Sequence, residues 1–380
     1  MSDPLHVLFV ARAETLHARR WIHQVAERGA RCSLAAVVGE GERDRCEGAE
    51  TVERLPVVPL RHPLYLPHLL RNILALKRTW SRIGPDLVHA HFVEDCGWLA
   101  WAAACRPWGV TAWGSDLLVL PGRSRTGIGR WLTGRTVRAA DFVTAPSEQL
   151  LEAARGLGAS PSRTQLLLWG VDRERFRPHA SGPDWRRRLE IPEEEPMVLS
   201  PRRMEPVYRI PDIVEAWRIL KTASRPGVLV LATDGGSLEE GVRKQVERAG
   251  LTGAVRFLEG VPYEEMPALF AAADLTVSVP ESDGTPMSVL ESMAAGTPVI
   301  VTDLPSLRPW VREGETGRRV AVGEPQELAG AVEDLLERPG TRERLGEEGI
   351  RLIEEKADQS AWMDRAVELY RETASGRPGA

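Results

Sequence analysis

Short apolar runs alternate with amphipathic helical patterns along almost the whole chain, and this alternation limits the possible fold more than any other feature. The first two runs, HVLFVA from His6 and CSLAAVV from Cys32, have the length and β-branched content of buried strands. Between them lies LHARRWIHQVAERG, a helical pattern that ends at Gly29, as helices commonly do. Continuous apolar strands separated by helices are typical of a parallel sheet with both faces covered, so the sequence predicts an α/β protein. Further runs in the first half begin at Leu55, Leu87, Gly109, Asp141 and Thr164.

The alternation is interrupted once, between Gly170 and Pro196, where the sequence is charged and carries four prolines. It restarts at Met197 and ends in a stretch that is helical from Pro325 to about Thr373. We therefore expect two facing, Rossmann-like, doubly wound domains with an interdomain cleft, where the ligands of such sheets bind. The predicted boundaries are 1–170 for the first domain, 171–196 for a linker, 197–357 for the second domain and 358–380 for a C-terminal helix that packs back on the first domain.

Composition and cysteine spacing indicate a cytoplasmic protein. The 380 residues are 43% hydrophobic and 27% charged, as in soluble globular proteins. The first apolar run has six residues and no basic leader, so it is not interpreted as a signal peptide. No run reaches the roughly eighteen apolar residues of a membrane span. Four cysteines without a C-x-x-C pair favour reduced thiols over a zinc site or disulfides.

Charge is distributed unevenly. Residues 1–180 hold 24 Lys and Arg against 18 Asp and Glu, while the remainder holds 25 against 36. A basic half favours an anionic partner. No acid occurs between Leu117 and Ala140, and a second basic stretch with an apolar face runs from Arg61 to Arg82. Both could dock on an anionic membrane surface or meet a phosphorylated lipid, or be ordinary helices packed on the sheet. Nucleic-acid binding is not expected, because interleaved aromatic residues are absent.

Several nucleotide and hydrolase motifs are missing. The first strand is followed by ARAETLHARR, which lacks the glycines of a dinucleotide-binding loop. TDGGS at Thr233 lacks the third glycine, and no Walker A, H-E-x-x-H or G-x-S-x-G motif occurs. The loops must therefore indicate some other chemistry.

The segment PESDGTPMSVLESMAAG, from Pro280, is the strongest candidate. It follows a predicted strand, with Asp283 on the loop and Glu291 about one turn into a helix. Amides of Met287 and Ser288 would form a helix N-terminus that attracts phosphate. A carboxylate on the helix can take both ribose hydroxyls, and one on the loop can hold a sugar hydroxyl. The alternative is that Asp283 starts a turn and Glu291 lies on a solvated helix face.

Two further groups accompany this segment. Arg202, Arg203 and Arg209 follow the first strand of the second domain, where they could clamp a diphosphate, although loop arginines are often simply solvated. His89 and His91 alternate along a strand end, and we expect one to face the sheet and the other the cleft, or both to be structural.

The order of these motifs resembles a known family. PRRMEPVYR, ATDGG and the run from VRFLEGVPYEEM to GETGRRV are similar to the donor domain of retaining nucleotide-sugar glycosyltransferases of family 4, which have the GT-B fold. PDLVHAHF, TAWGSD, ADFVTAPSEQL and GVDRERFRP extend the resemblance, less strongly, to the first half. It implies metal-independent transfer of a sugar from a UDP- or GDP-sugar, bound by the second domain, to a hydroxyl acceptor bound by the first. The expected location is cytoplasmic, with peripheral association at the inner membrane face as an open addition.

The resemblance also implies roles for single residues. Glu291 would hold the ribose and Asp283 the donor sugar, so the nearby Glu281 is interpreted as a decoy, an acid without a role in binding the donor. The usual lysine of the family falls on Tyr208, and we infer that Arg209 supplies its charge. The first acid of the family is commonly Glu, and Pro286 replaces a glycine. The predicted sets are Asp283, Arg203, Arg209 and His91 as catalytic residues; Gly284, Thr285, Met287, Ser288, Glu291 and Gly235 as donor-binding residues; Trp113, Asp116 and His17 in the acceptor and sugar cleft; and no metal ligands.

One departure concerns the acceptor side. Trp113 stands where family members often have a histidine that touches the transferred sugar, so it could stack on a sugar or merely line the cleft.

The mechanism implied is a front-face substitution, because no enzymic nucleophile stands out. Two alternatives remain: a catalytically silent, carbohydrate-binding protein of the same fold, and a same-fold epimerase or phosphorylase.

Overall fold

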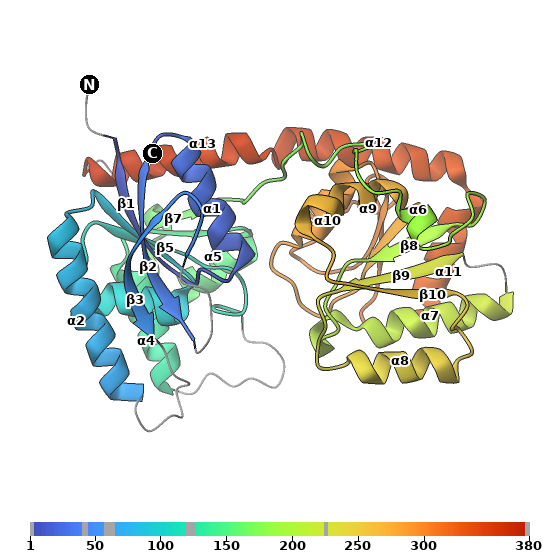
Figure 1. The fold of residues 1–380 in the computed structure, drawn as a ribbon, viewed down its shortest axis with the longest axis horizontal. Helices are drawn as coiled ribbons and strands as arrows, with labels where there is room; N and C mark the ends of the chain where they lie inside the picture. The colour runs from blue at the N-terminus through green and yellow to red at the C-terminus, as the bar shows by residue number, and fades with distance from the viewer. Residues whose placement is uncertain (1–3, 40–44, 57–64, 119–126, 224–226, 377–380) are drawn as a thin grey trace. The chain divides into compact units, whose positions relative to one another are not determined.

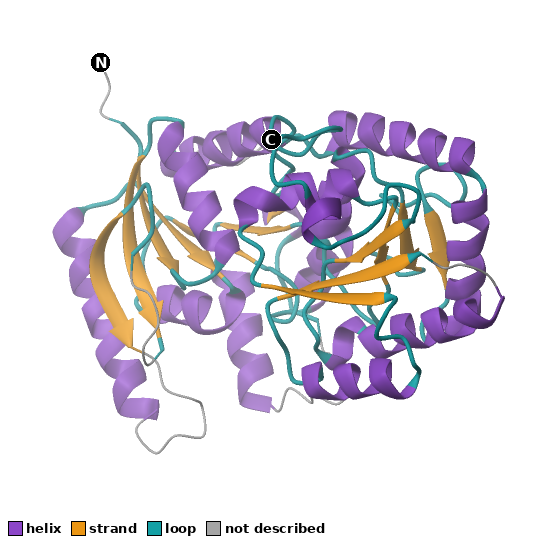
Figure 2. Ribbon diagram, turned by 45° about the vertical axis from the view of Figure 1, so that its right-hand side comes forward, coloured by secondary structure: helices purple, strands orange, loops and turns teal. Residues whose placement is uncertain are grey.

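A computed structural model describes residues 4–39, 45–56, 65–118, 127–223 and 227–376. By internal contacts the chain divides into two compact units. Unit 1 comprises Met1–Trp169 and Ser360–Ala380, and unit 2 comprises Gly170–Gln359. Each unit is an α/β body around one parallel sheet with helices on both faces, so the prediction of two doubly wound α/β domains is confirmed (Figures 1 and 2).

The sheet of unit 1 has seven strands in the order β3-β2-β1-β4-β5-β6-β7. They are β1 His6–Ala11, β2 Arg31–Val38, β3 Glu50–Pro56, β4 Leu87–His91, β5 Trp108–Thr111, β6 Phe142–Ala145 and β7 Thr164–Leu166. Helices α2 (Tyr65–Ile83), α3 (Trp98–Ala102) and α4 (Gly127–Ala139) share one buried core with this sheet. Helices α1 (Leu16–Glu27) and α13 (Gln359–Ala374) pack on the other face through Trp21 and Tyr370. Helix α5 (Glu148–Gly156) follows β6.

The sheet of unit 2 has six strands in the order β10-β9-β8-β11-β12-β13. They are β8 Met197–Ser200, β9 Val228–Thr233, β10 Val255–Glu259, β11 Leu275–Ser278, β12 Val299–Thr302 and β13 Arg318–Val320. One face packs against α7 (Ile210–Ala223), α8 (Glu239–Arg248) and α11 (Pro325–Glu337). The remaining helices are α6 (Trp185–Arg188), α9 (Met266–Ala272), α10 (Met287–Ala294) and α12 (Pro339–Lys356).

Two sequence expectations differ from the structure. The apolar run from Leu55 was expected to be a strand, but β3 begins earlier, at Glu50, and residues 57–64 lie outside the described part of the chain. The segment 171–196 was expected to be a linker, yet it belongs to unit 2. Its aromatic side chains explain this: Phe176 is buried with its ring 6.1 Å from that of Phe270, and the indole N–H of Trp185 donates to the Glu265 carbonyl at 3.4 Å.

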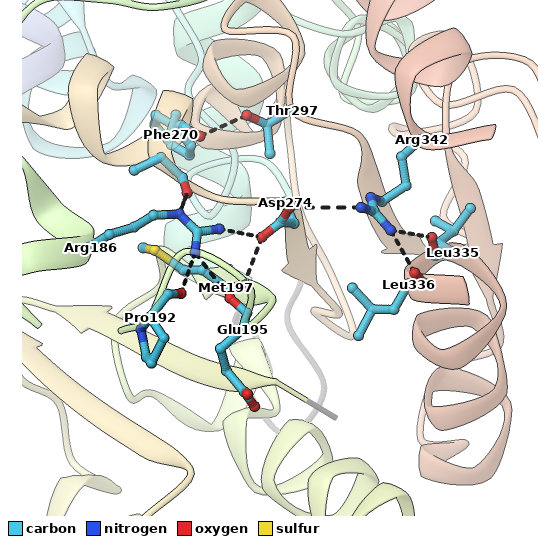
Figure 3. Close-up of polar contacts among 11 residues, drawn as sticks. Arg186, Pro192, Glu195, Met197, Phe270, Asp274, Thr297, Leu335, Leu336 and Arg342 are labelled. Atoms are coloured by element: carbon cyan, nitrogen blue, oxygen red, sulfur yellow. Dashed lines mark hydrogen bonds and ion pairs between the residues drawn. The ribbon is translucent and has the colours of Figure 1, made fainter. Parts of the chain in front are cut away.

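A polar cluster fixes the amino edge of the unit 2 sheet (Figure 3). Asp274, directly before β11, accepts hydrogen bonds from Arg186 at 2.5 Å and from the Met197 amide of β8 at 2.8 Å. Arg186 also donates to the carbonyls of Pro192 and Glu195. One carboxylate thus joins the segment before β8 to the starts of two adjacent strands. Ligands bind beyond the opposite, carboxyl edge, so this cluster is structural.

Candidate active site

The carboxyl edge of the unit 2 sheet brings two loops together. Strands β8 and β11 are parallel neighbours, with Leu275 beside Val198 and Thr276 beside Leu199. The chain order reverses at this pair, which is where doubly wound sheets bind ligands. The loop 201–209 follows β8 and the loop 279–286 follows β11, so both predicted motifs, the arginine group and the acidic segment, lie at this point.

Asp283 is held in place by Arg202. Nη2 of Arg202 donates to Oδ2 of Asp283 at 2.6 Å, and its Nε donates to the Ser278 hydroxyl at 2.9 Å. The guanidinium also lies 5.1 Å from the centre of the Tyr208 ring, a cation–π contact. Both members of the ion pair are largely buried, at 11% and 14% side-chain exposure. The sequence placed Arg202 in the arginine group, but it gave no signal that this arginine, rather than Arg203, would grip the acid.

The other two arginines differ sharply in how their charges are matched. Arg209 donates to Asp212 at 2.6 Å and lies 3.6 Å from Glu281. The residue interpreted as a decoy is therefore a partner of this arginine. Arg203 is 59% exposed, and the one ion-pair contact it makes within the described residues, to Glu205, is long at 3.9 Å. Of the arginines in this loop, Arg203 has the least compensated charge.

Helix α10 carries the second predicted acid. Glu291 is only 5% exposed and accepts a hydrogen bond from the Tyr263 hydroxyl at 2.8 Å. The alternative that it lies on a solvated helix face is therefore wrong. The helix begins at Met287 after Pro286, which cannot cap it with a side chain, and the Ser288 hydroxyl oxygen is buried without a partner among the described residues. Backbone N–H groups at the start of a helix have no acceptor within the helix, so they favour the binding of an anion. Gly284 and Thr285 lie in the preceding loop.

The glycines after β9 let a third loop approach this site. Gly235 has φ +79° and its carbonyl accepts the Met204 amide at 3.0 Å. Gly236 has φ +150°, and a Cβ there would lie 2.4 Å from the Met204 carbonyl oxygen. A side chain at Gly236 would thus push the arginine loop away. The sequence placed only Gly235 in the site, although its neighbour has the stricter steric requirement.

Unit 1 places both strand histidines on one face of its sheet. His89 and His91 are two residues apart in β4, so their side chains leave the strand on the same side. Their ring centres are 4.5 Å apart, and both are buried. The expectation that one faces the sheet and the other the cleft is therefore wrong. Burial lowers the pKa of His91 to about 3, with a further contribution from His17, and no described residue bonds to either ring nitrogen.

His89 belongs to a buried polar chain whose direction can be assigned. The indole N–H of Trp21, which can only donate, donates a hydrogen bond to the Tyr370 oxygen at 2.7 Å. The Tyr370 hydroxyl must then donate to Nδ1 of His89 at 2.6 Å, which leaves Nε2–H to donate to Thr111 at 2.8 Å. His89 is thus a neutral imidazole that joins α1 and α13 to the sheet. Its role is structural.

Trp113 is packed among other rings. The His17 imidazole stacks on it at 5.2 Å and 10°, and His91 lies tilted against it at 5.6 Å. Trp21 and Trp169 contact it edge-on. A sugar could stack on the face that His17 covers only by displacing that imidazole. The arrangement therefore favours the alternative that Trp113 is a lining residue packed in an aromatic cluster, with one face covered by the exposed His17.

Asp116 has a role other than the expected contact with a ligand. Its side chain is fully buried, and it accepts hydrogen bonds from the amides of Val93, Trp113 and Gly114 at 2.8–3.0 Å. Burial raises its pKa, although these amides oppose the rise. Asp116 thus fixes the loops after β4 and β5. In the same region Arg12, after β1, donates to Asp95, after β4, at 2.9 Å.

The basic stretches of unit 1 expose apolar side chains. On α2, Leu70 and Leu74 are each 54% exposed; on α4, Ile128 and Trp131 are 76% and 54% exposed. Neither helix contains an acidic residue. Arg61, Arg123 and Arg125, also part of these stretches, lie outside the described residues. No helix in the described ranges is long and apolar enough to span a bilayer, and no cluster of three potential metal ligands occurs among those residues.

Comparison with known proteins identifies the class. Residues 182–352 match the family "Glycosyl transferases group 1", and residues 15–175 match "Glycosyltransferase Family 4". The chain is 30% identical over 313 residues to a D-inositol 3-phosphate glycosyltransferase of Thermomonospora curvata, covering 75% of this chain and 71% of that protein. A Streptomyces scabiei protein of the same name is 30% identical over 334 residues, covering 78% and 73%.

Solved structures show the same architecture. Sucrose-phosphate synthase of Thermosynechococcus elongatus has a TM-score of 0.84 at 20% identity, over 98% of this chain and 100% of that one. Anabaena HepE, solved with UDP and glucose, has a TM-score of 0.78 at 17% identity, over 97% and 100%. Two parallel α/β units of this kind are the GT-B fold. The chain belongs to family 4 of the glycosyltransferases, the retaining enzymes that use nucleotide sugars, so the predicted fold and activity class are confirmed.

Proposed function

We propose that unit 2 binds a uridine diphosphate sugar, with Glu291 on the ribose and Asp283 on the sugar. The observation that carries this proposal is the position of the two acids. One is buried on the first turns of α10, the other is held by an ion pair, and both lie at the carboxyl edge beside the β8–β11 reversal. Uracil is the proposed base because HepE, a protein of the same fold, was solved with UDP and glucose.

The diphosphate would bind between the amino end of α10 and Arg203. The Met287 and Ser288 amides supply donors there, and Arg203 offers a positive charge that, among the described residues, faces only the distant carboxylate of Glu205. Arg209 is already faced by Asp212 and Glu281, so its part in offsetting phosphate charge would be smaller. Arginines rather than a metal would then stabilise the leaving diphosphate, and turnover should persist in excess EDTA.

The proposed reaction is a front-face substitution. The bond between the anomeric carbon and the phosphate oxygen breaks, and the acceptor oxygen bonds to the same face of that carbon. The acceptor proton passes to the leaving phosphate oxygen. Asp283 would orient the sugar without forming a covalent bond. A sugar mass found on Asp283 in quenched enzyme would contradict this mechanism and indicate double displacement.

For the acceptor, we propose a hydroxyl of a phosphorylated polyol. Two relatives are named D-inositol 3-phosphate glycosyltransferases, and the first 180 residues, which hold most of unit 1, carry an excess of cations. Initial rates with D-inositol 3-phosphate and with inositol test this. Equal rates would contradict a requirement for phosphate, and no product with either would move the search to other acceptors.

The exposed apolar residues and acid-free helices α2 and α4 support a second proposal, peripheral docking on an anionic membrane. Both helices contact α3 and lie on one face of the sheet (Figure 1). Cations on them, such as Arg71 and Arg130, would meet lipid phosphates while Leu70 and Trp131 enter the interface. Co-sedimentation with phosphatidylglycerol vesicles should exceed that with phosphatidylcholine vesicles. Leu70→Ser with Trp131→Ser should abolish it, whereas Leu166→Ser, at another exposed leucine of unit 1, should not. Equal binding to both lipids would contradict the proposal.

A thermal-shift screen against UDP, GDP and ADP and their sugars tests the donor proposal. UDP and at least one UDP-sugar should raise the melting temperature, because a ligand that binds only the folded state stabilises it. A larger shift with GDP or ADP would correct the base. No shift with any nucleotide would favour a catalytically silent protein. A product formed with UDP-sugar and acceptor separates transfer from epimerase or phosphorylase activity.

A further inference from the structure

Arg202 makes three contacts that together leave its guanidinium little freedom. It donates to Asp283 at 2.6 Å and to Ser278 at 2.9 Å, and its guanidinium carbon lies over the Tyr208 ring, 5.1 Å from the ring centre. Ser278 is the last residue of β11, a buried strand, so this anchor is rigid. A planar, fully charged guanidinium suits such a site, because it can stack and donate in several directions at once.

The two loops of the donor site are also joined at a second place. The Glu281 amide donates to the Val207 carbonyl at 2.9 Å, and the Glu281 carboxylate lies 3.6 Å from Arg209. Together with the Arg202–Asp283 pair, these contacts connect the loop after β8 to the loop after β11 on both sides of Tyr208. The position of Asp283 thus depends on residues of the other loop.

We propose that Arg202 and Tyr208 are positioning residues that fix the direction of the Asp283 carboxylate toward the donor sugar. Arg202 occupies Oδ2, and no described residue donates to Oδ1, which leaves that oxygen as the acceptor for a sugar hydroxyl. The ring of Tyr208 restrains the guanidinium through their cation–π contact. Arg202 therefore acts through Asp283 and does not bind the diphosphate, which is left to Arg203. This inference rests on the proposed contact between Asp283 and the sugar.

A split between nucleotide and sugar recognition tests the inference. For Arg202→Gln we expect kcat/KM for the UDP-sugar to fall about 30- to 100-fold, while the dissociation constant of UDP, measured by calorimetry, changes less than threefold. Tyr208→Leu should lower kcat/KM in the same direction but less, and Tyr208→Phe, which keeps the ring, should behave like wild type. Retained UDP binding shows that each variant is folded. A loss of UDP affinity in Arg202→Gln as large as the loss of kcat/KM would overturn the inference, because it would place Arg202 on the diphosphate.

A double-mutant cycle separates this inference from the proposed function. If Arg202 acts through Asp283, then adding Arg202→Gln to Asp283→Asn should cause little further loss of kcat/KM. Fully additive losses would contradict the positioning role. Asp283→Asn alone tests the assignment of Asp283 to the sugar: wild-type kcat/KM in that variant would refute the proposed donor site itself. Loss in Asp283→Asn with wild-type activity in Arg202→Gln would refute only the positioning role.

Discussion

The indole N–H of Trp21 donates to the hydroxyl oxygen of Tyr370 at 2.7 Å, across 349 positions of sequence. Tyr370 is fully buried, and its hydroxyl donates a hydrogen bond to Nδ1 of His89. Helix α13, which follows unit 2 in the sequence, is in this way attached to the sheet of unit 1.

Tyr370→Phe should therefore destabilise unit 1. The change leaves the Trp21 N–H and Nδ1 of His89 buried without partners, and we expect a loss of about 2–4 kcal/mol in the free energy of unfolding from two such groups. Urea denaturation followed by tryptophan fluorescence measures it. Glu368→Gln, at a 60% exposed position on the same helix, is the control and should cost less than about 0.5 kcal/mol. Equal effects of the two changes would show that the polar chain does not stabilise the fold.

Stability should decrease on acidification through the two buried histidines. Burial lowers the pKa of His89 and His91 below the usual value of 6.5, so the unfolded chain binds these protons more readily than the folded protein. Above about pH 6.5 both histidines are neutral in the folded and in the unfolded protein, so they do not reduce the free energy of unfolding. As pH falls below that value, each histidine lowers this free energy by about 1.4 kcal/mol per pH unit. His91→Leu should reduce the slope of unfolding free energy against pH, between pH 6 and 4, by about 1.4 kcal/mol per pH unit, which is what one histidine contributes. His23→Gln, on a partly exposed position of α1, is the control; an unchanged slope in His91→Leu would contradict the account.

Arg186→Ala should lower stability without affecting donor binding. It removes the ion pair to Asp274 and the hydrogen bonds to two carbonyls before β8 (Figure 3). Because Asp274 remains partly exposed, we expect a loss of about 1–3 kcal/mol rather than the full cost of an unpaired buried charge. Arg187→Ala, at an 86% exposed side chain, is the matched control. A changed dissociation constant of UDP in Arg186→Ala would show that the amino edge is coupled to the site.

The alternation of apolar runs and helical patterns was sufficient to predict the two parallel sheets, because buried strands need continuous apolar sequence. It failed at β3, whose sequence ETVERLP is polar, as an edge strand can be. It also failed at 170–196, where prolines and charges concealed the buried anchors Phe176 and Trp185. In segment 170–196 the contacts of these two side chains, rather than periodicity, show where the chain packs.

The acidic segment could be proposed from sequence because the spacing of Asp283 and Glu291 and the helix start between them are local features. The partners of these acids were not found. Arg202 and Arg203 are adjacent, and only the path of the loop decides which reaches Asp283. Tyr263 lies 28 residues before Glu291, and no local pattern connects them. The strand period of two could have shown that His89 and His91 share a face.

The affinity of the protein for UDP, measured by calorimetry in wild type, Glu291→Gln and Glu240→Gln, tests the central claim most directly. Glu240 is 84% exposed on α8 and serves as the control. If Glu291 holds the ribose, Glu291→Gln should weaken UDP binding at least tenfold, about 1.4 kcal/mol, because an uncharged amide replaces a buried carboxylate that would accept hydrogen bonds from the ribose hydroxyls. Glu240→Gln should leave the affinity at the wild-type value. Equal affinity in Glu291→Gln and wild type would contradict the proposed donor site.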